Sequence, residues 1–271
     1  MINFDTRVDL AYVMATGLFK YFPADWEKLK WFTNGQILLT PPQYFNDPWD
    51  FLVRFEPYTD AQLKRKAAEL QLPLEHLREM VMASDFLREE SSDYQKEIGR
   101  IVGVVCLAEN PLDRAMWAHY GGSHHGFLAE FAHGAEFLED GFRQRVGPFG
   151  PAAKVQYLKP HEQQPECRRD LSNIANILWT KHSEWECEQE WRVVQSHANR
   201  ATLGQASDGT PRSLLGFDPK HLIRVIFGLR VCPTVEETLR EMLGRPEFGN
   251  VRKERADIDS VTNELISREL R

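Results

Sequence analysis

The sequence has few cysteines and no long apolar run, and these two absences each exclude a class of protein. Its four cysteines show no short paired spacing, which argues against a zinc knuckle or a CxxC redox motif. We therefore expect free, buried thiols in a reducing compartment. No stretch approaches the ~18 apolar residues of a membrane helix. Residues 1–9 lack a basic segment followed by an apolar run, so we expect a soluble, cytoplasmic protein that does not bind membranes.

An excess of positive charge is also missing. The net charge of −7 argues against nonspecific binding of nucleic-acid phosphates, although a local basic cleft remains compatible with it. Neither a GxGxxG motif nor a Walker loop is present, so a Rossmann or P-loop fold has no support. The 271 residues include 42% hydrophobic residues, enough for a sizeable core, and we expect one domain over residues 1–271.

Hydrophobic periodicity predicts interspersed helices and strands without a regular βαβ order. Helices are predicted over 26–32, 59–70, 74–98, 112–120, 168–182 and 233–243, and strands over 36–40, 101–107, 126–131, 154–158, 191–195 and 222–227. The polar, glycine-rich segment 196–212 is predicted to be a loop, and the second helix of the 59–99 region is expected to break near Ser91. This pattern predicts an α+β fold with a central mixed, mostly antiparallel sheet, peripheral helices and a charged helical insertion at about 59–99.

The first polar-aromatic cluster is Phe45–Asp50, with the sequence FNDPWD. Asn and Asp before Pro favour a turn, because their side chains bond to nearby backbone N–H groups. One interpretation is a structural turn. The other is that Asn46 or Asp47 faces a ligand from that turn.

The second cluster contains Trp117 and Tyr120, which lie three residues apart and share a helix face. They could form an aromatic wall that holds a planar ring such as nicotinamide or a base. Alternatively they are core aromatics, and the nearby histidines cap a turn. The histidines His119, His124 and His125 lack an i, i+4 pair and a carboxylate triad, so we predict no metal site.

The third cluster is Trp185–Arg192. If its second half is a strand, Glu188, Glu190 and Arg192 face one side. Burying these charges is costly unless they pair, and perturbed carboxylates often act in clefts. A solvated edge with a simple Arg–Glu pair is the alternative. We favour Glu190 as the principal catalytic residue, because Arg192 can orient its carboxylate. All three clusters are expected to converge on one cleft, within about 15 Å of one another.

Taken in order, these residues resemble domain-of-unknown-function family 2971, which occurs in bacteria and phage. The matching positions are Lys20-Tyr21, Asn46–Asp50, Met116–Tyr120, His125-Gly126, Lys181 and Trp185–Arg192. Two features depart from the family pattern: Cys187 stands where an aromatic residue is expected, and the insertion after Asp50 is longer. The ligand-binding positions that follow from the resemblance and the clusters are Lys20, Tyr21, Asn46, Asp47, Trp117, His125, Lys181 and Arg192.

A weaker resemblance is to the ADP-ribosyltransferase superfamily. Those enzymes carry a His or Arg on an early strand, a Tyr or Ser midway and a Glu on a late strand. The corresponding residues here are Lys20 or Tyr21, then His119 or Tyr120, then Glu188 or Glu190. The early Lys-Tyr departs from that pattern. The resemblance implies NAD as a substrate and a glutamate that stabilises positive charge at the anomeric carbon.

Two classes of function stay open at this point. The first is an NAD-consuming enzyme of ADP-ribosyltransferase or glycohydrolase type, with a protein or nucleic-acid acceptor and a role as a toxin or antiphage effector. The second is a non-catalytic module that senses a nucleotide-like ligand or binds a protein. A third hypothesis is metal-dependent hydrolysis of nucleotides or nucleic acids. We consider it weaker, because the sequence offers a poor set of metal ligands. The sequence leaves the oligomeric state open.

Overall fold

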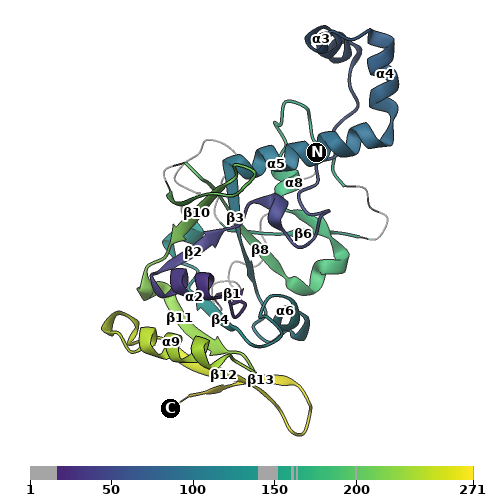
Figure 1. Cartoon of the computed structure of the whole chain (residues 1–271). Helices are drawn as coiled ribbons and strands as arrows, with labels where there is room; N and C mark the ends of the chain where they lie inside the picture. The colour runs from purple at the N-terminus through teal and green to yellow at the C-terminus, as the bar shows by residue number, and fades with distance from the viewer. Residues whose placement is uncertain (1–16, 140–151, 160–161, 163, 199, 271) are drawn as a thin grey trace.

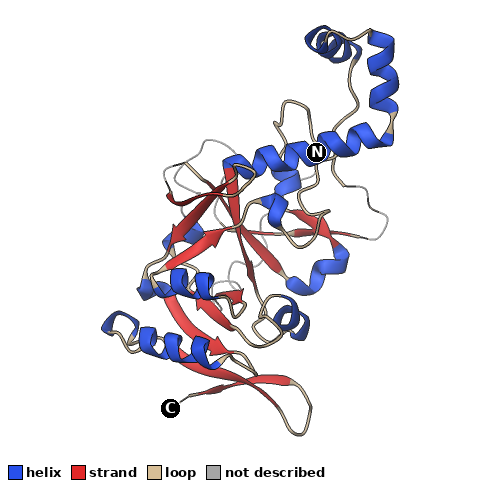
Figure 2. Cartoon of the chain, viewed as in Figure 1, coloured by secondary structure: helices blue, strands red, loops and turns tan. Residues whose placement is uncertain are grey.

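The computed structural model describes residues 17–139, 152–159, 162, 164–198 and 200–270, so the segment 1–9 considered above lies outside it. An eight-stranded sheet forms the body of the molecule (Figures 1 and 2). In spatial order its strands are β13 (Leu265–Glu269), β12 (Arg252–Ile258), β11 (Leu222–Phe227), β4 (Phe127–Phe131), β1 (Leu18–Phe22), β3 (Val102–Ala108), β8 (Glu190–Ser196) and β5 (Ala153–Lys154). Its described pairs are antiparallel except β11–β12, which confirms the predicted α+β fold with a mixed, mostly antiparallel sheet.

Strand β3 lies between β1 and β8 inside this sheet, as the apolar run predicted. Both faces of the strand are covered, and Val104 and Val105 are about 1% exposed or less. A strand buried on both faces needs apolar residues at successive positions, which explains the continuous hydrophobic run. The site described below is built around this strand.

Two smaller sheets flank the large one. One contains β2 (Gln36–Leu39), β10 (Pro211–Gly216) and β9 (Ala201–Gln205), and the other contains β6 (Gln156–Leu158) and β7 (Thr180–His182). The predicted strand 154–158 is divided between sheets, because the backbone N–H of Val155 bonds to Glu190 while that of Gln156 bonds to Trp179. The prediction of a loop over residues 196–212 was wrong, because this segment contains β9 and the start of β10. Every residue of β9 is exposed, so this edge strand lacks the apolar alternation that identifies a strand.

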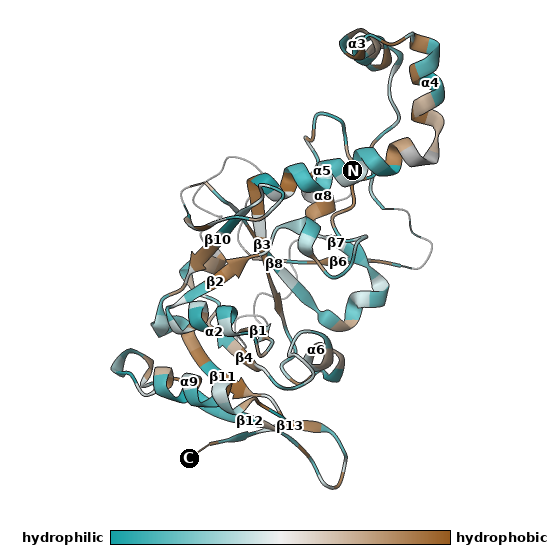
Figure 3. Cartoon of the chain, in the orientation of Figure 1, coloured by the Kyte–Doolittle hydropathy of each residue, from teal (hydrophilic) through white to brown (hydrophobic). Residues whose placement is uncertain are grey.

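The largest hydrophobic cluster packs two helices on the sheet. Helix α2 (Trp26–Thr33) contributes Leu29 and Phe32, helix α9 (Pro233–Leu243) contributes Leu239 and Met242, and Phe127 is a central sheet residue among them. Hydrophobic residues also gather on β2, β10 and β11 (Figure 3). The side chain of Asp25 caps α2 by accepting a hydrogen bond from Lys28 N.

A helical insertion extends from this body, as predicted for residues 59–99 (Figure 1). It comprises α3 (Asp60–Leu70), α4 (Leu74–Met82) and α5 (Ser84–Ile101), and its small core contains Leu63, Ala67 and Leu77. The expected break near Ser91 was wrong, because α5 is continuous and the chain turns at Ala83 instead. The Ser91 hydroxyl donates to the backbone oxygen of Val53 and so supports α5 rather than ending it.

The remaining helices are short: α6 (Arg114–His119), α7 (Glu136–Glu139), α8 (Ala175–Leu178), and the 3-10 turns η1 (Pro42–Tyr44), η2 (Ser183–Glu188), η3 (Pro219–His221) and η4 (Pro246–Phe248). The predicted helix 168–182 was wrong except at α8. Asp170 and Asn173 accept hydrogen bonds from the backbone N–H groups of Ser172 and Arg168, and Leu171 has a positive φ of 62°. Such local bonds compete with helix formation.

The four cysteines are free, as expected, but they are not all buried: Cys167 is buried and Cys187 is exposed. Within the part of the chain that the structure describes, no helix combines the length and apolar character that crossing a membrane requires.

Candidate functional site

The three polar-aromatic clusters meet at one place, as predicted. The amide of Asn46 donates to the Tyr120 hydroxyl at 3.1 Å, and that hydroxyl donates to Glu188 Oε1 at 2.5 Å. Arg192 Nη2 donates to Asp50 Oδ2 at 2.6 Å. Direct hydrogen bonds therefore join each cluster to another.

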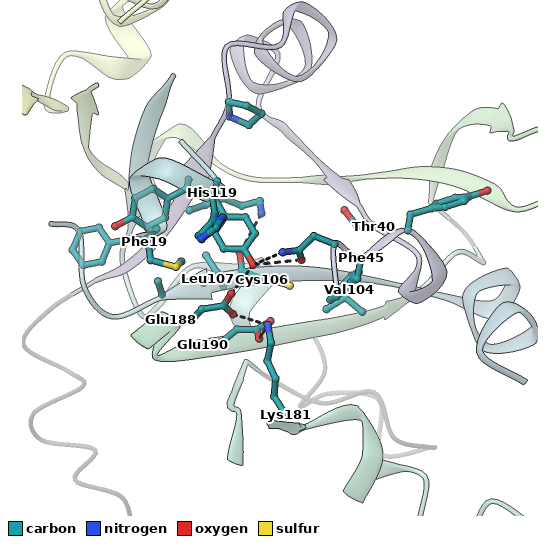
Figure 4. A pocket seen from close by; sticks show the side chains of 18 of the residues that line it. Phe19, Thr40, Phe45, Val104, Cys106, Leu107, His119, Lys181, Glu188 and Glu190 are labelled. Atoms are coloured by element: carbon teal, nitrogen blue, oxygen red, sulfur yellow. Dashed lines mark hydrogen bonds and ion pairs between the residues drawn. The ribbon is translucent and has the colours of Figure 1, made fainter. Parts of the chain in front are cut away.

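A cavity of about 310 Å³ opens beside these contacts (Figure 4). Strands β1 and β3, turn η1 and helix α6 provide most of its walls, and the start of β8 provides one end. Aromatic and charged side chains dominate the lining. The aromatic residues are Phe19, Tyr21, Tyr44, Phe45 and Tyr120, and the charged residues are Lys20, Lys28, Lys181, Glu188 and Glu190. This mixture suits a ligand that has both planar rings and polar groups.

Behind the cavity, Arg192 is fully buried and anchors two carboxylates. Its guanidinium donates from Nε to Glu190 Oε1 at 2.8 Å and from Nη2 to Glu190 Oε2 at 2.9 Å, in addition to the bond with Asp50. Nη1 bonds to the Leu178 carbonyl at 2.9 Å, and the group lies 4.4 Å from the centre of the Phe51 ring. Because the planar guanidinium group is bonded through Nε, Nη1 and Nη2 and packs against the Phe51 ring, it holds these carboxylates in fixed positions.

Lys181 on β7 bridges three carboxylates. Its Nζ lies 2.6 Å from Glu188, 3.1 Å from Glu190 and 3.4 Å from Asp50. Burial opposes the charge on Lys181, but these carboxylates outweigh burial and raise its pKa above the ordinary value. Figure 4 shows Lys181 reaching the two glutamates, which lie side by side.

The two glutamates differ in their electrostatics. Burial opposes ionisation of Glu190, but Arg192 and Lys181 outweigh it and hold its pKa at about 2. At Glu188, burial exceeds the effect of Lys181 and, with the repulsion of Glu190, raises the pKa above that of an ordinary carboxyl group. Glu190 is thus a fixed anion, and Glu188 is the carboxyl group whose charge responds to its surroundings.

The local backbone explains how both glutamates reach the site. The shared face expected for Glu188, Glu190 and Arg192 depended on a strand that includes Glu188, but Glu188 ends η2 and Glu190 begins β8. Between them Gln189 adopts a left-handed conformation with φ 44°. This turn directs Glu188 toward Tyr120, while strand alternation places Glu190 and Arg192 together as expected.

Several predicted residues line the cavity. Lys20 on β1 donates to the Cys106 carbonyl at 3.1 Å, and Tyr21 donates to the Asn110 carbonyl at 2.7 Å. Burial lowers the pKa of Lys20. Besides these two, the predicted residues in the lining are Asn46, His119, Tyr120, Lys181, Glu188 and Glu190.

Four other predicted residues lie outside the lining. Asp47 accepts a hydrogen bond from Trp49 N at 3.0 Å, which is the structural turn considered above. Trp117 is fully buried and donates to the Pro111 carbonyl, so it is a core aromatic. His125 lies beside the Gly122 carbonyl, and Arg192 lies behind the carboxylates.

Sequence reasoning missed other residues of the site. Phe19 lies on β1, a strand that the apolar segment LFKYF did not reveal because it is only five residues long. Lys28 lies on the first turn of α2, and Cys106 lies within the apolar run of β3. Asp50 belongs to the quoted motif, and its pairing with Arg192 could have been inferred from the need to neutralise a buried guanidinium.

No group of three or more His, Cys, Asp and Glu side chains suited to holding a metal occurs among the residues that the structure describes. The acidic side chains Asp50, Glu188 and Glu190 instead form ion pairs with Arg192 and Lys181.

Comparison with known proteins gives one match. No curated protein and no solved structure matches the chain. Residues 116–193 match a family model described as "Protein of unknown function (DUF2971)". This segment contains the second and third clusters and Lys181, whereas Lys20-Tyr21 and Asn46–Asp50 precede it. This match over residues 116–193 agrees with the resemblance to family 2971 that the order of the motifs indicated.

Proposed function

We propose that the cavity binds NAD and that the protein cleaves the bond between nicotinamide and ribose. One observation carries this proposal: the Glu188 carboxylate, held by Tyr120 and Lys181, lies in a cavity with aromatic walls. A planar nicotinamide ring suits such walls, and ribose hydroxyls suit the carboxylate. Lys20 and Lys28 supply positive charge for the two phosphates.

The chemistry requires a carboxylate that is held close to the anomeric carbon and is ionised when the substrate is bound. When the C1′–N1 bond breaks, nicotinamide leaves with the bonding electrons and positive charge develops on the ribose. A carboxylate oriented beforehand stabilises that charge. Water, or an acceptor hydroxyl or amine, then forms the new bond to C1′ and loses a proton, whereas an acceptor carboxylate forms that bond without releasing one. The cationic nicotinamide ring also favours the ionised form of Glu188, because a nearby positive charge lowers the pKa of a carboxyl group.

We assign the catalytic role to Glu188 and a positioning role to Glu190. Both oxygens of Glu190 accept hydrogen bonds from Arg192, and one of them also contacts Lys181. Little hydrogen-bonding capacity is left for a substrate. The order of the parts supports the proposal, because it resembles the order in ADP-ribosyltransferases: Lys20 lies on β1, His119 and Tyr120 lie at the end of α6, and Glu188 and Glu190 lie just before and at the start of β8.

The test is incubation of the full chain with NAD, followed by chromatography of nicotinamide and ADP-ribose. We expect the wild type to release nicotinamide and Glu188→Gln to lose a factor of about 10² or more in rate. Glu186→Gln is the matched control, because Glu186 is exposed in the same turn η2 and should retain full activity. Equal activity of Glu188→Gln and wild type, or no nicotinamide from either, would reject the proposal. With a protein or nucleic-acid acceptor, as expected of a toxin or antiphage effector, the label of adenine-labelled NAD would instead appear on the acceptor.

A second function, a non-catalytic nucleotide sensor, is favoured by one observation. Glu188 is only 3% exposed, and each of its oxygens already has a partner in Tyr120 or Lys181. Such a carboxylate would recognise a ligand without assisting bond cleavage. Calorimetric binding of NAD that leaves the NAD intact after prolonged incubation would support the sensor and exclude the enzyme.

A further inference from the structure

A second cavity lies away from the site described above, between the helical insertion and the segment 52–58. Its volume is about 580 Å³, within the range of small-molecule sites. Its apolar lining comes from Leu52, Val53, Phe55, Pro57, Tyr58, Leu63, Val81, Met82 and Leu87. The cavities share none of their lining residues, so a ligand here would be separate from one beside Glu188.

The charges around this cavity are mostly positive. Four arginines line it, Arg54, Arg78, Arg88 and Arg169, against the single carboxylate Glu166. Much of this charge is compensated locally, because Arg54 pairs with Glu166, Arg78 pairs with Asp60 and Glu75, and Arg169 pairs with Glu90. Arg88 also has an interaction partner. An apolar cavity with arginine side chains at its wall suits a ligand that has an apolar body and an anionic head.

Arg169 shows where such a head would bind. Its guanidinium lies 3.2 Å from the centre of the Tyr58 ring, its Nε donates to the Glu56 carbonyl and its Nη1 donates to Glu90. These contacts fix the group, yet its Nη2 is buried and has no hydrogen-bond partner. A buried donor without an acceptor is costly, and a ligand oxygen would remove that cost.

The cavity rim also carries exposed apolar side chains. Met82 is 85% exposed and Leu87 is 44% exposed, and both belong to the lining. Exposed large apolar side chains that gather beside a cavity mark binding surfaces. They would cover the apolar part of a ligand whose head contacts Arg169.

We propose that this cavity binds a small amphipathic anion, with a carboxylate or phosphate head on Arg169 and an apolar chain against Val81 and Leu87. The proposal is independent of the proposed NAD cleavage, because it concerns other residues and another ligand. It assigns a ligand-binding role to the helical insertion.

The test is isothermal titration calorimetry of the full chain with octanoate, octyl phosphate and octanol. We expect one-to-one binding of octanoate or octyl phosphate, and the tighter of the two identifies the head group. Octanol, which has the same chain without the charge, should bind at least about tenfold more weakly. No binding of either anion at millimolar concentration, or equal binding of octanol, would overturn the proposal.

Two variants and a control locate the site. Arg169→Gln should weaken binding about tenfold or more. Because Arg169 also packs on Tyr58, Leu87→Glu gives a second measurement: it places a carboxylate at an exposed rim position and should weaken anion binding as strongly. Leu70→Glu should leave binding unchanged, because Leu70 is 50% exposed on the same insertion but outside the lining. Unchanged binding in both Arg169→Gln and Leu87→Glu would reject the site.

Discussion

At the scale of residues, the surroundings lower the pKa of Glu190 and raise that of Glu188. We expect Glu190→Gln to lower the free energy of unfolding by ~3–5 kcal/mol, because it leaves the buried Arg192 without its main counter-charge. Urea denaturation followed by circular dichroism measures this. Glu186→Gln, an exposed change in the adjacent turn, should stay within about 0.5 kcal/mol of wild type. Equal stability of Glu190→Gln and wild type would contradict the role given to this ion pair.

A change in pH should affect the contributions of Glu190 and Glu188 to stability in opposite directions. The folded-state pKa of Glu190 is about 2, below the ordinary 4.5, so its contribution to stability is present above about pH 4.5 and is lost as the pH falls toward 2. The pKa of Glu188 is raised, so its ionisation opposes folding and this cost grows as the pH rises above 4.5.

Comparison of wild type with Glu190→Gln removes the contribution of carboxyl groups distant from the site, because these contribute equally to both proteins. Asp50 and Glu188, whose pKa values Glu190 raises, change in the same comparison. Between about pH 5 and pH 2.5 the wild type should lose more stability than the variant, by up to roughly 3 kcal/mol. Urea midpoints at steps of pH provide the measurement. Parallel pH curves for the two proteins would show that Glu190 is not the depressed carboxyl group.

At the scale of elements, the turn at Gln189 determines where both glutamates lie. A β-branched residue is disfavoured at its φ of 44°, so Gln189→Val should cost ~1–2 kcal/mol of stability and should also impair ligand binding or activity. Gln189→Gly should keep both, because glycine adopts this conformation freely.

Gln71 offers a matched control in the same left-handed conformation, with φ 56°, at the end of α3. Gln71→Val should cost similar local stability without affecting the cavity beside Glu188. Denaturation and NAD binding of the three variants at the two positions give the comparison. If Gln189→Val bound NAD as well as Gln71→Val did, the turn would have no part in shaping the site.

Elements with a strong local pattern were predictable from the sequence, and those defined by distant partners were not. Helix α9 matches its predicted bounds, and β3 and β11 lie within a residue of theirs, because their apolar patterns are dense. Strands β12 and β13 were missed because polar and charged residues occupy much of both. The meeting of the three clusters was predictable from their composition. The buried position of Trp117 and the left-handed turn at Gln189 were not, because each depends on packing that no short segment specifies.

At the scale of the whole molecule, the insertion has a small core of its own. Leu77 is fully buried with Leu63 and Ala67, separately from the cluster beneath the large sheet. Leu77→Ala should remove ~2–5 kcal/mol from the stability of the insertion and should abolish octanoate binding while the site at Glu188 persists.

Hydrogen exchange would test this independence. In Leu77→Ala the amides of α3 and α4 should exchange faster while those of β3 keep their protection. Val105→Ala, in the core around β3, is the reverse comparison and should speed exchange throughout the sheet. Faster exchange of β3 in Leu77→Ala would show that the two cores unfold as one unit.

The buried charges around Arg192 also bear on the lifetime of the folded molecule. Asp50 and Arg192 are 142 residues apart in the chain, and Arg192 lies on β8, which pairs with β3. Because a contact between such distant residues closes a long loop, we expect it to form after β3 and β8 have paired. Contacts that form after the rate-limiting step of folding slow unfolding and leave the folding rate nearly unchanged. A molecule that has closed this cluster must therefore break it before the sheet can open, and the cluster governs how long the fold lasts rather than how quickly it is reached.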